Sequence, residues 1–211
     1  MSCPICQKRR AGRFCPAKAE KICTVCCGTE REVTLACPPD CAYLLSAHRY
    51  EDQQPRALPV DTPLLDVHIA SDIVHAHGQF LSAMAFAIAK FCSGEPSASD
   101  SHVLGALRSL AETYKTLVSG IVYEQPPVIL LERELYDALA RFITEARQSA
   151  PQASRRPPKD SEIFQLLVFL FRMGLLRTNG RPRSRRFIEF LRGQFPGAQE
   201  LKRQESRIIV P

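Results

Sequence analysis

The 211-residue sequence has no apolar run long enough to cross a membrane. Its longest apolar stretch, residues 80–91, is interrupted by Ser82 and Lys90 and falls short of the roughly 20 residues that a transmembrane helix requires. The first ten residues also lack the apolar core and the small-residue cleavage site of a secretory signal. We therefore expect a cytoplasmic protein that makes no membrane contact.

The sequence also lacks the local patterns of common enzyme sites. It contains no glycine-rich phosphate-binding loop and no recognisable Ser-His-Asp or Cys-His arrangement. His68, Asp72 and His75 have a spacing that can present metal ligands on one helix face, but the same spacing is typical of the polar flank of an amphipathic helix. Cys92 is better interpreted as a buried core thiol than as a nucleophile. We leave enzymatic activity open and favour a non-enzymatic protein.

Cysteine is scarce over most of the chain, because Cys92 is the only one beyond position 41. The other eight are crowded at the start: Cys3, Cys6, Cys15, Cys23, Cys26, Cys27, Cys37 and Cys41. In a reducing cytosol such thiols bind metal and do not form a disulfide framework. Eight thiolates complete two tetrahedral Zn(Cys)4 sites with no open position, so we predict two structural Zn²⁺ ions. Four thiolates also suit an iron–sulfur cluster, which is the second interpretation.

The cysteines divide between two ions in more than one way. Cys26 and Cys27 are adjacent and project in different directions, which indicates that they serve different ions. The first division gives one ion Cys3, Cys6, Cys23 and Cys26, and gives the other ion Cys15, Cys27, Cys37 and Cys41. The alternative joins Cys3 and Cys6 to Cys37 and Cys41 and leaves the middle four for the other ion. His48, seven residues after Cys41, can replace one thiolate, although a surface histidine is the simpler interpretation.

The cysteines lie in four short motifs, CPIC (3–6), RFCP (13–16), ICTVCCGTERE (22–32) and CPPDC (37–41). These motifs resemble a group of uncharacterised bacterial cysteine-rich zinc-binding proteins. The interleaved cysteines are also similar to the B-box, MYND and HIT-type fingers, which mediate protein contacts, over residues 3 to about 48. The histidine-rich ligand pairs that end those fingers are missing here. The resemblance implies a metal-binding module and supplies no reaction.

The expected fold is a small zinc-binding module, irregular with short β structure and a helix, followed by a mostly α-helical domain. We assign residues 1–50 to the module, 51–62 to a linker, 63–149 to the helical domain, 150–160 to a flexible connector and 161–211 to a helical C-terminal segment with a basic turn. Apolar periodicity predicts helices over about 63–91, 101–119, 128–148 and 161–176. Ser184 is the expected cap of a last helix.

The positive charge of the chain gives the main lead on a partner. The formal net charge is +6, but each Zn²⁺ with four thiolates carries −2, so two sites leave about +2. Basic side chains are concentrated near the C-terminal end, in a turn that carries Arg177, Arg181, Arg183, Arg185 and Arg186. Such a turn can contact phosphate, although a charge run is usually a solvated face. We expect an adaptor or regulatory factor that binds a protein, with a nucleic-acid-binding regulator as the alternative and an enzyme third.

Overall fold

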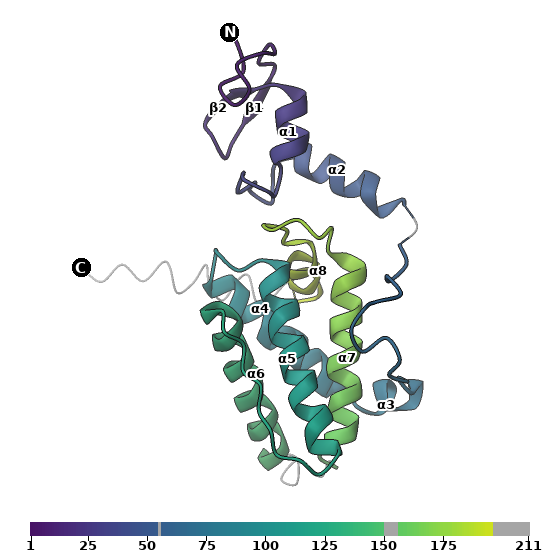
Figure 1. Ribbon diagram of the computed structural model, residues 1–211. Coiled ribbons are helices and arrows are strands. Elements are labelled where there is room, and N and C mark those ends of the chain that lie inside the picture. Colours follow the sequence, from purple (N-terminus) through teal and green to yellow (C-terminus); the bar gives the residue numbers. More distant parts are fainter. Residues whose placement is uncertain (55, 150–155, 196–211) are drawn as a thin grey trace, which may run out of the picture. The chain divides into compact units, whose positions relative to one another are not determined.

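The computed structural model describes residues 1–54, 56–149 and 156–195 (Figure 1). In this part of the chain the protein is mostly helical, with eight helices and one two-stranded sheet. The chain divides into two compact units, Met1–Ala57 with Asn179–Ser184, and Leu58–Thr178 with Arg185–Pro211. We call them the cysteine unit and the helical unit and describe each by itself. No helix among the described residues is both long and apolar enough to span a membrane.

The cysteine unit contains a small antiparallel hairpin and two helices. Strands β1 (Arg13–Cys15) and β2 (Glu20–Ile22) pair with Phe14 opposite Lys21. Helix α1 spans Thr24–Glu30 and α2 spans Ala42–Asp52. Ile22 and Leu35 are fully or almost fully buried, and their buried neighbours in this cluster are the cysteines Cys3, Cys15, Cys23 and Cys26. Leu44 of α2 is also buried, and three aliphatic side chains bury far too little apolar area to stabilise such a unit unaided.

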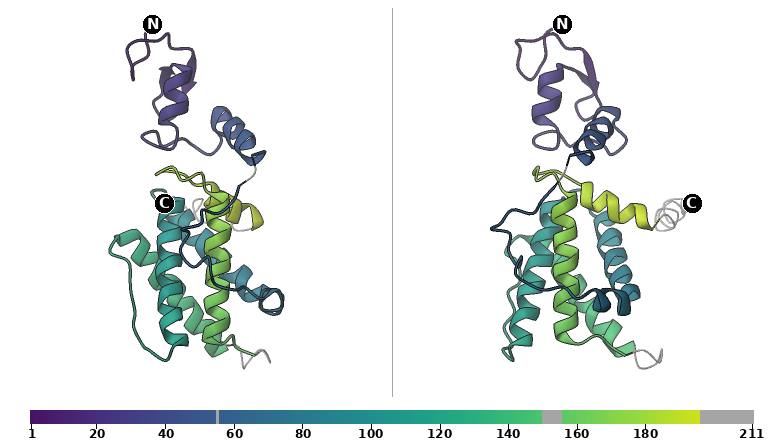
Figure 2. Two further views of the ribbon diagram at one scale, coloured as in Figure 1. Left: turned by 45° about the vertical axis from the view of Figure 1, so that its right-hand side comes forward. Right: turned by 90° about the vertical axis from the view of Figure 1, so that its right-hand side faces the viewer.

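The helical unit contains α3 (Ser71–Ala76), α4 (Gly78–Gly94), α5 (Asp100–Val118), α6 (Leu130–Ser149), α7 (Asp160–Arg177) and α8 (Arg186–Gln194). Helix α5 packs against α6 and α7, and α4 packs against α6 and α8. The segment that joins α5 to α6 runs back along the bundle, so these two helices point the same way (Figure 1). Helix α8 lies across one end of the bundle (Figure 2). Buried apolar side chains of α4, α5, α6, α7 and α8 form one continuous core.

The predicted helices at about 101–119, 128–148 and 161–176 are confirmed as α5, α6 and α7. The single helix expected over 63–91 is wrong, because the helix begins only at Ser71 and is interrupted at His77. Tertiary contacts hold the preceding residues in an irregular conformation. Arg172 of α7 donates to the carbonyl oxygens of Leu64 and Val67, and Gln165 accepts from the backbone N–H of Ala70.

The cap position of the last helix is one residue later than the expected Ser184. Ser184 is buried, and Arg185 occupies the cap position of α8. The carboxylate of Asp100 serves this helix start, since its Oδ1 accepts from the N–H groups of Phe187 and Ile188 at 3.1 Å each. Helices α7 and α8 pack within the same unit as α4, α5 and α6. Residues 150–155 of the expected connector and residues 196–211 lie outside the described part of the chain.

Candidate metal centre

Four cysteine sulfurs from two distant motifs meet in the cysteine unit. The Sγ atoms of Cys3, Cys6, Cys23 and Cys26 all lie within 4.8 Å of one another, and those of Cys6 and Cys23 are 3.9 Å apart. A regular tetrahedron with Zn–S bonds of roughly 2.3 Å separates its sulfurs by about 3.8 Å. The cysteines are free, and the Cys6–Cys23 separation is far longer than a disulfide bond. This group, which we call the first group, can therefore hold a metal ion.

Backbone N–H groups direct the sulfurs of the first group. The N–H of Cys23 donates to Sγ of Cys3 at 3.3 Å, and the N–H of Cys26 donates to Sγ of Cys23 at 3.3 Å. The second contact is also the N-terminal cap of α1, so one sulfur begins the helix and faces the ligand group. N–H donors stabilise thiolates and orient them, which is the role that outer-sphere partners have at metal sites.

The thiols of the first group differ strongly in acidity. The backbone N–H groups of Lys8 and Arg9 lower the pKa of Cys6 to about 6. Burial and the neighbouring thiols Cys23 and Cys6 raise the pKa of Cys26 to about 12. Adjacent thiolates repel one another, so the four thiols do not ionise together without a cation among them. A divalent ion removes that repulsion and releases the protons as it binds.

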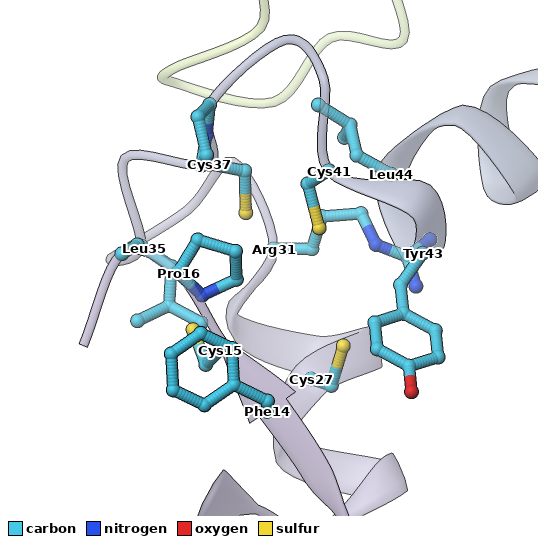
Figure 3. A pocket seen from close by; sticks show the side chains of 12 residues that line it. Phe14, Cys15, Pro16, Cys27, Arg31, Leu35, Cys37, Cys41, Tyr43 and Leu44 are labelled. Atoms are coloured by element: carbon cyan, nitrogen blue, oxygen red, sulfur yellow. The ribbon is translucent and has the colours of Figure 1, made fainter. Parts of the chain in front are cut away.

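The remaining four N-terminal cysteines surround a second point in the same unit. Figure 3 shows the sulfur atoms of Cys15, Cys27, Cys37 and Cys41 turned toward a common space. They come from the end of β1, from α1, from the following loop and from the residue before α2. The cavity between them has a volume of about 10 Å³, on the scale of one water-sized sphere. We call these four the second group.

The second group is more widely spaced than the first, which alone among the described residues meets the 4.8 Å spacing. Its thiols still affect one another. Burial raises the pKa of Cys37, and Cys41 and Cys15 raise it further, against a lowering hydrogen bond from the backbone of Glu32. Cys26 belongs to the first group and its neighbour Cys27 to the second. Cys37 and Cys41 line the cavity of the second group together with Cys15 and Cys27. The two groups therefore correspond to the first division of the cysteines, in which the two ligand sets interleave along the chain.

His48 lies beside a carboxylate. Its Nε2 is 3.1 Å from Oε2 of Glu32, a residue that is 3% exposed and has a φ of 54°. Nδ2 of Asn179 donates to the same oxygen at 2.8 Å. Burial raises the pKa of Glu32, but the hydrogen bonds from His48 and Asn179 and the charge of Arg181 outweigh it, so the pKa is lowered. No local sequence pattern points to Glu32, because its partners come from α2 and from residues 179–181.

Residues of the basic turn make hydrogen bonds within the protein. Nη1 of Arg181 donates to the carbonyl oxygens of Gly28 and Arg31, 3.0 and 2.5 Å away, and the backbone N–H of Arg183 donates to the Glu32 carbonyl at 2.8 Å. These contacts fasten residues 179–184 to the end of α1 within the cysteine unit. The side chain of Arg183 is exposed.

In the helical unit, the arginines on either side of that segment also have partners. The guanidinium of Arg177 lies 4.1 Å from the ring centroid of Phe190. Arg185 donates to the carbonyl oxygens of Cys92, Pro96 and Ala98, and Arg186 is buried. The guanidinium groups of Arg177 and Arg185, which the sequence suggested for phosphate binding, therefore contact an aromatic ring and backbone carbonyls of the protein itself.

The helical histidines do not form the ligand row that their spacing suggested. His68 precedes α3, whereas Asp72 and His75 lie within that six-residue helix, so the three do not share one helix. Among the described residues no group of metal-ligand side chains within bonding reach includes them. Cys92 is 1% exposed, and burial raises its pKa to about 12, as expected for an inert core thiol.

Comparisons with protein-family models, with curated proteins and with solved structures give no match. The resemblance to bacterial zinc proteins therefore rests on the cysteine motifs, and the functional argument rests on the residues of this chain.

Proposed function

We propose that the protein binds two structural zinc ions and acts as a non-enzymatic adaptor for another protein. Cys3, Cys6, Cys23 and Cys26 would hold the first ion, and Cys15, Cys27, Cys37 and Cys41 the second. Both donor sets consist of four sulfurs, which suits Zn²⁺ and leaves no position for a substrate. The described residues of the unit include only three buried aliphatic side chains, Ile22, Leu35 and Leu44, so metal binding, worth about 10 to 16 kcal/mol per structural zinc site, would supply most of its stability.

The spacing of the first group favours a single ion over an iron–sulfur cluster. In a four-iron cluster each thiolate binds a different iron, which holds the sulfurs farther apart than one shared ion does. The free thiols also favour a reducing compartment, and we propose the cytoplasm.

An exposed apolar segment of the helical unit is the observation that supports a protein partner. Seven large apolar side chains between positions 118 and 130 are 48 to 100% exposed: Val118, Ile121, Val122, Tyr123, Val128, Ile129 and Leu130. We call this segment the apolar strap. Isolated exposed aliphatic residues are normal on a protein surface, but seven large apolar side chains exposed within thirteen positions favour an interaction site.

The backbone of the apolar strap is fixed against the bundle. The hydroxyl of Thr116 donates to the carbonyl of Tyr123 at 3.0 Å, and the N–H of Gln125 donates to the hydroxyl of Thr113 at 3.4 Å. Pro127 is buried between these exposed residues. The anchored backbone therefore holds the exposed apolar side chains in place, so a partner can bind them without the cost of first ordering the segment.

Acidic groups beside the apolar strap indicate the chemistry of the partner. A hollow of about 450 Å³ next to it is lined by Glu124, Tyr136, Asp137, Ala140 and Arg141, and residues 51–150 carry 13 Asp and Glu against 7 Lys and Arg. Negative charge repels nucleic acid and anionic lipid. The strap fits a protein segment that combines aliphatic side chains with flanking lysine or arginine.

Selection from a random peptide library on the zinc-loaded protein tests this function. We expect enrichment of aliphatic peptides with basic flanks, and we expect Val122→Asp and Val128→Asp to abolish their binding. Val60→Asp is the matched control, because Val60 is 94% exposed in the same unit but lies outside the strap. Failure to enrich such peptides, or equal binding by Val122→Asp, contradicts the proposal.

A nucleic-acid-binding role is the second candidate, supported by Lys8, Arg9, Arg10 and Arg183, which are all exposed. The internal contacts of Arg177, Arg181 and Arg185 reduce the charge that the basic turn can offer to phosphate. Binding of a single-stranded RNA homopolymer that weakens steeply with salt, and is lost in Arg183→Glu, would favour this candidate over the adaptor.

A further inference from the structure

The helical unit contains a half-open cavity of about 730 Å³ that the adaptor function does not use. It lies beside the start of α4, the C-terminal part of α6 and the residues that lead into α7. The described residues that line it include His75, His77, Phe80, Phe142, Ala146 and Arg156. Small-molecule sites have volumes of roughly 300 to 1,000 Å³ and combine apolar walls with a few polar groups.

One side of this cavity is apolar. The rings of Phe80 on α4 and Phe142 on α6 have centroids 5.7 Å apart and are tilted by 36°. Ala83 and Ala146, from the same two helices, also line the cavity. Their small side chains leave space beside the two rings, so the wall can accept a flat aromatic or an aliphatic body.

The other side carries more basic than acidic groups. His77 and Arg156 line the cavity, and both lie near one carboxylate, with Oε2 of Glu162 3.3 Å from Nε2 of His77 and Oε1 3.2 Å from Nη2 of Arg156. Nδ1 of His75 donates to the carbonyl of Ser71 at 2.6 Å. Because the Arg156 side chain is 63% exposed, it can turn toward a bound anion at little cost.

The N-terminus of α4 adds to this basic side. Gly78, Gln79 and Phe80 form its first turn and line the cavity. The described structure shows no side-chain cap on this helix and no acidic residue in its first turn. The N–H groups of an uncapped turn carry partial positive charge and favour an anion.

We propose that this cavity binds a small organic anion, with its aromatic or aliphatic body against Phe80 and Phe142 and its carboxylate or phosphate near His75, His77 and Arg156. The site is independent of the metal ions and of the apolar strap. It gives the helical unit a ligand of its own, whose occupancy adds to the stability of the fold by mass action.

A pair of fluorescent dyes with the same apolar body tests the proposal. 1-Anilinonaphthalene-8-sulfonate carries a sulfonate, whereas N-phenyl-1-naphthylamine is uncharged. We expect the zinc-loaded protein to bind the sulfonate dye about tenfold more tightly, and Arg156→Gln to remove about that factor while the affinity for the uncharged dye stays the same. Equal affinity of the wild type for the two dyes would overturn the anion-binding part of the proposal.

Two variants that fill the cavity separate this site from other apolar surfaces. Ala83→Trp and Ala146→Phe should each abolish binding of both dyes, with helix content unchanged in circular dichroism. The two substitutions lie on different helices, so the test still works if one of the two variants does not fold. Val122→Ser and Val128→Ser, in the apolar strap, should leave dye binding intact. Dye binding that survives both filled variants, or that is lost in the strap variants, would overturn the proposal.

Discussion

Asn179 donates a hydrogen bond of 2.8 Å to the carboxylate of Glu32, which lies 147 positions earlier in the sequence. The contact belongs to a set that includes Arg181 with the carbonyls of Gly28 and Arg31, and the N–H of Arg183 with the carbonyl of Glu32. The cysteine unit is therefore discontinuous, because residues 179–184 complete it. These residues bind at the end of α1, the helix that carries Cys26 and Cys27.

Metal removal should release residues 179–184 to protease. Trypsin cleaves after arginine but not before proline, so within this segment the bond after Arg183 is open to it and the bond after Arg181 is not. Ser184, at the cleavage point, is buried in the folded unit. We expect this bond to resist trypsin in zinc-loaded protein and to be cut after chelation, because structural zinc sites unfold without metal. Timed digestion followed by mass spectrometry measures the rate.

Arg181→Ala provides the matching test with the metal in place. Loss of two hydrogen bonds from a charged donor should weaken attachment of the segment by about 1 to 3 kcal/mol, so cleavage after Arg183 should speed up about tenfold or more while the zinc content is unchanged. Bonds within α5 and α6 serve as the internal control and should stay protected. Equal cleavage after Arg183 with and without zinc would contradict the discontinuous unit.

Replacing Cys26 and Cys27 separately tests the interleaved metal sites. Each substitution by serine should lower the zinc content from about two ions per chain to about one, because each removes one ligand of a four-sulfur site. The thiols that become reactive should differ. Alkylation should reach Cys3, Cys6 and Cys23 in Cys26→Ser, and the second group in Cys27→Ser, as read by peptide mass spectrometry.

Cys92→Ser is the control for this pair. Its thiol is buried in the helical unit, apart from both cysteine groups, so two zinc ions should remain. The interleaved assignment fails if Cys26→Ser and Cys27→Ser expose the same set of thiols.

The sequence identified the eight cysteines because their signals are local, but it left two ways of dividing them between ions. Two CxxC turns offer paired sulfurs, and the adjacency of Cys26 and Cys27 favoured one division without excluding the other, because the closeness of sulfurs from different motifs depends on the fold. The helices α5, α6 and α7 could also be predicted, since each has a regular apolar face. The long-range contacts that complete the fold could not be predicted from the sequence. Asp100 serves the start of α8 from 87 positions away, and Arg172 holds the segment before α3 out of helical conformation, so local propensity was overridden by distant partners.

The stability of the helical unit should depend on pH through Glu162. Burial raises the pKa of this carboxyl, but the N–H of Lys159 and the charges of Arg156 and His77 outweigh burial and lower it. Its ionised form therefore stabilises the folded state above the unfolded-state pKa of about 4.3, and the contribution disappears as pH falls through the lower folded-state pKa. We expect Glu162→Gln to cost about 1 kcal/mol at pH 7 and almost nothing near pH 2.

Urea unfolding of wild type and Glu162→Gln at matched pH values measures this difference. Comparing the two proteins at each pH cancels the loss of zinc in acid, which affects both equally. Glu134→Gln on the exposed side of α6 is the control and should give no pH-dependent difference. A cost of Glu162→Gln that stays constant or grows toward acid pH would contradict the assignment of the ion pairs.

Gly174 marks a close approach of α7 to α5 and α8. A Cβ atom added there would lie 2.8 Å from Cδ2 of Leu104 on α5 and 2.8 Å from Cε1 of Phe187 on α8. Phe187 is fully buried and cannot move aside without disturbing the core. Overpacking of this kind costs about 1 to 3 kcal/mol, so Gly174→Ala should lower the free energy of unfolding by that amount.

Gly193→Ala is the matched substitution, because Gly193 lies in α8 and a Cβ there meets no atom within 4 Å. Alanine should be neutral at this position or stabilise the helix by up to about 1 kcal/mol. If α5, α7 and α8 pack as described, denaturant unfolding should show a loss of stability for Gly174→Ala and none for Gly193→Ala. A neutral Gly174→Ala would mean that α7 does not approach Leu104 and Phe187 this closely, and the packing of α8 on the bundle would have to be revised.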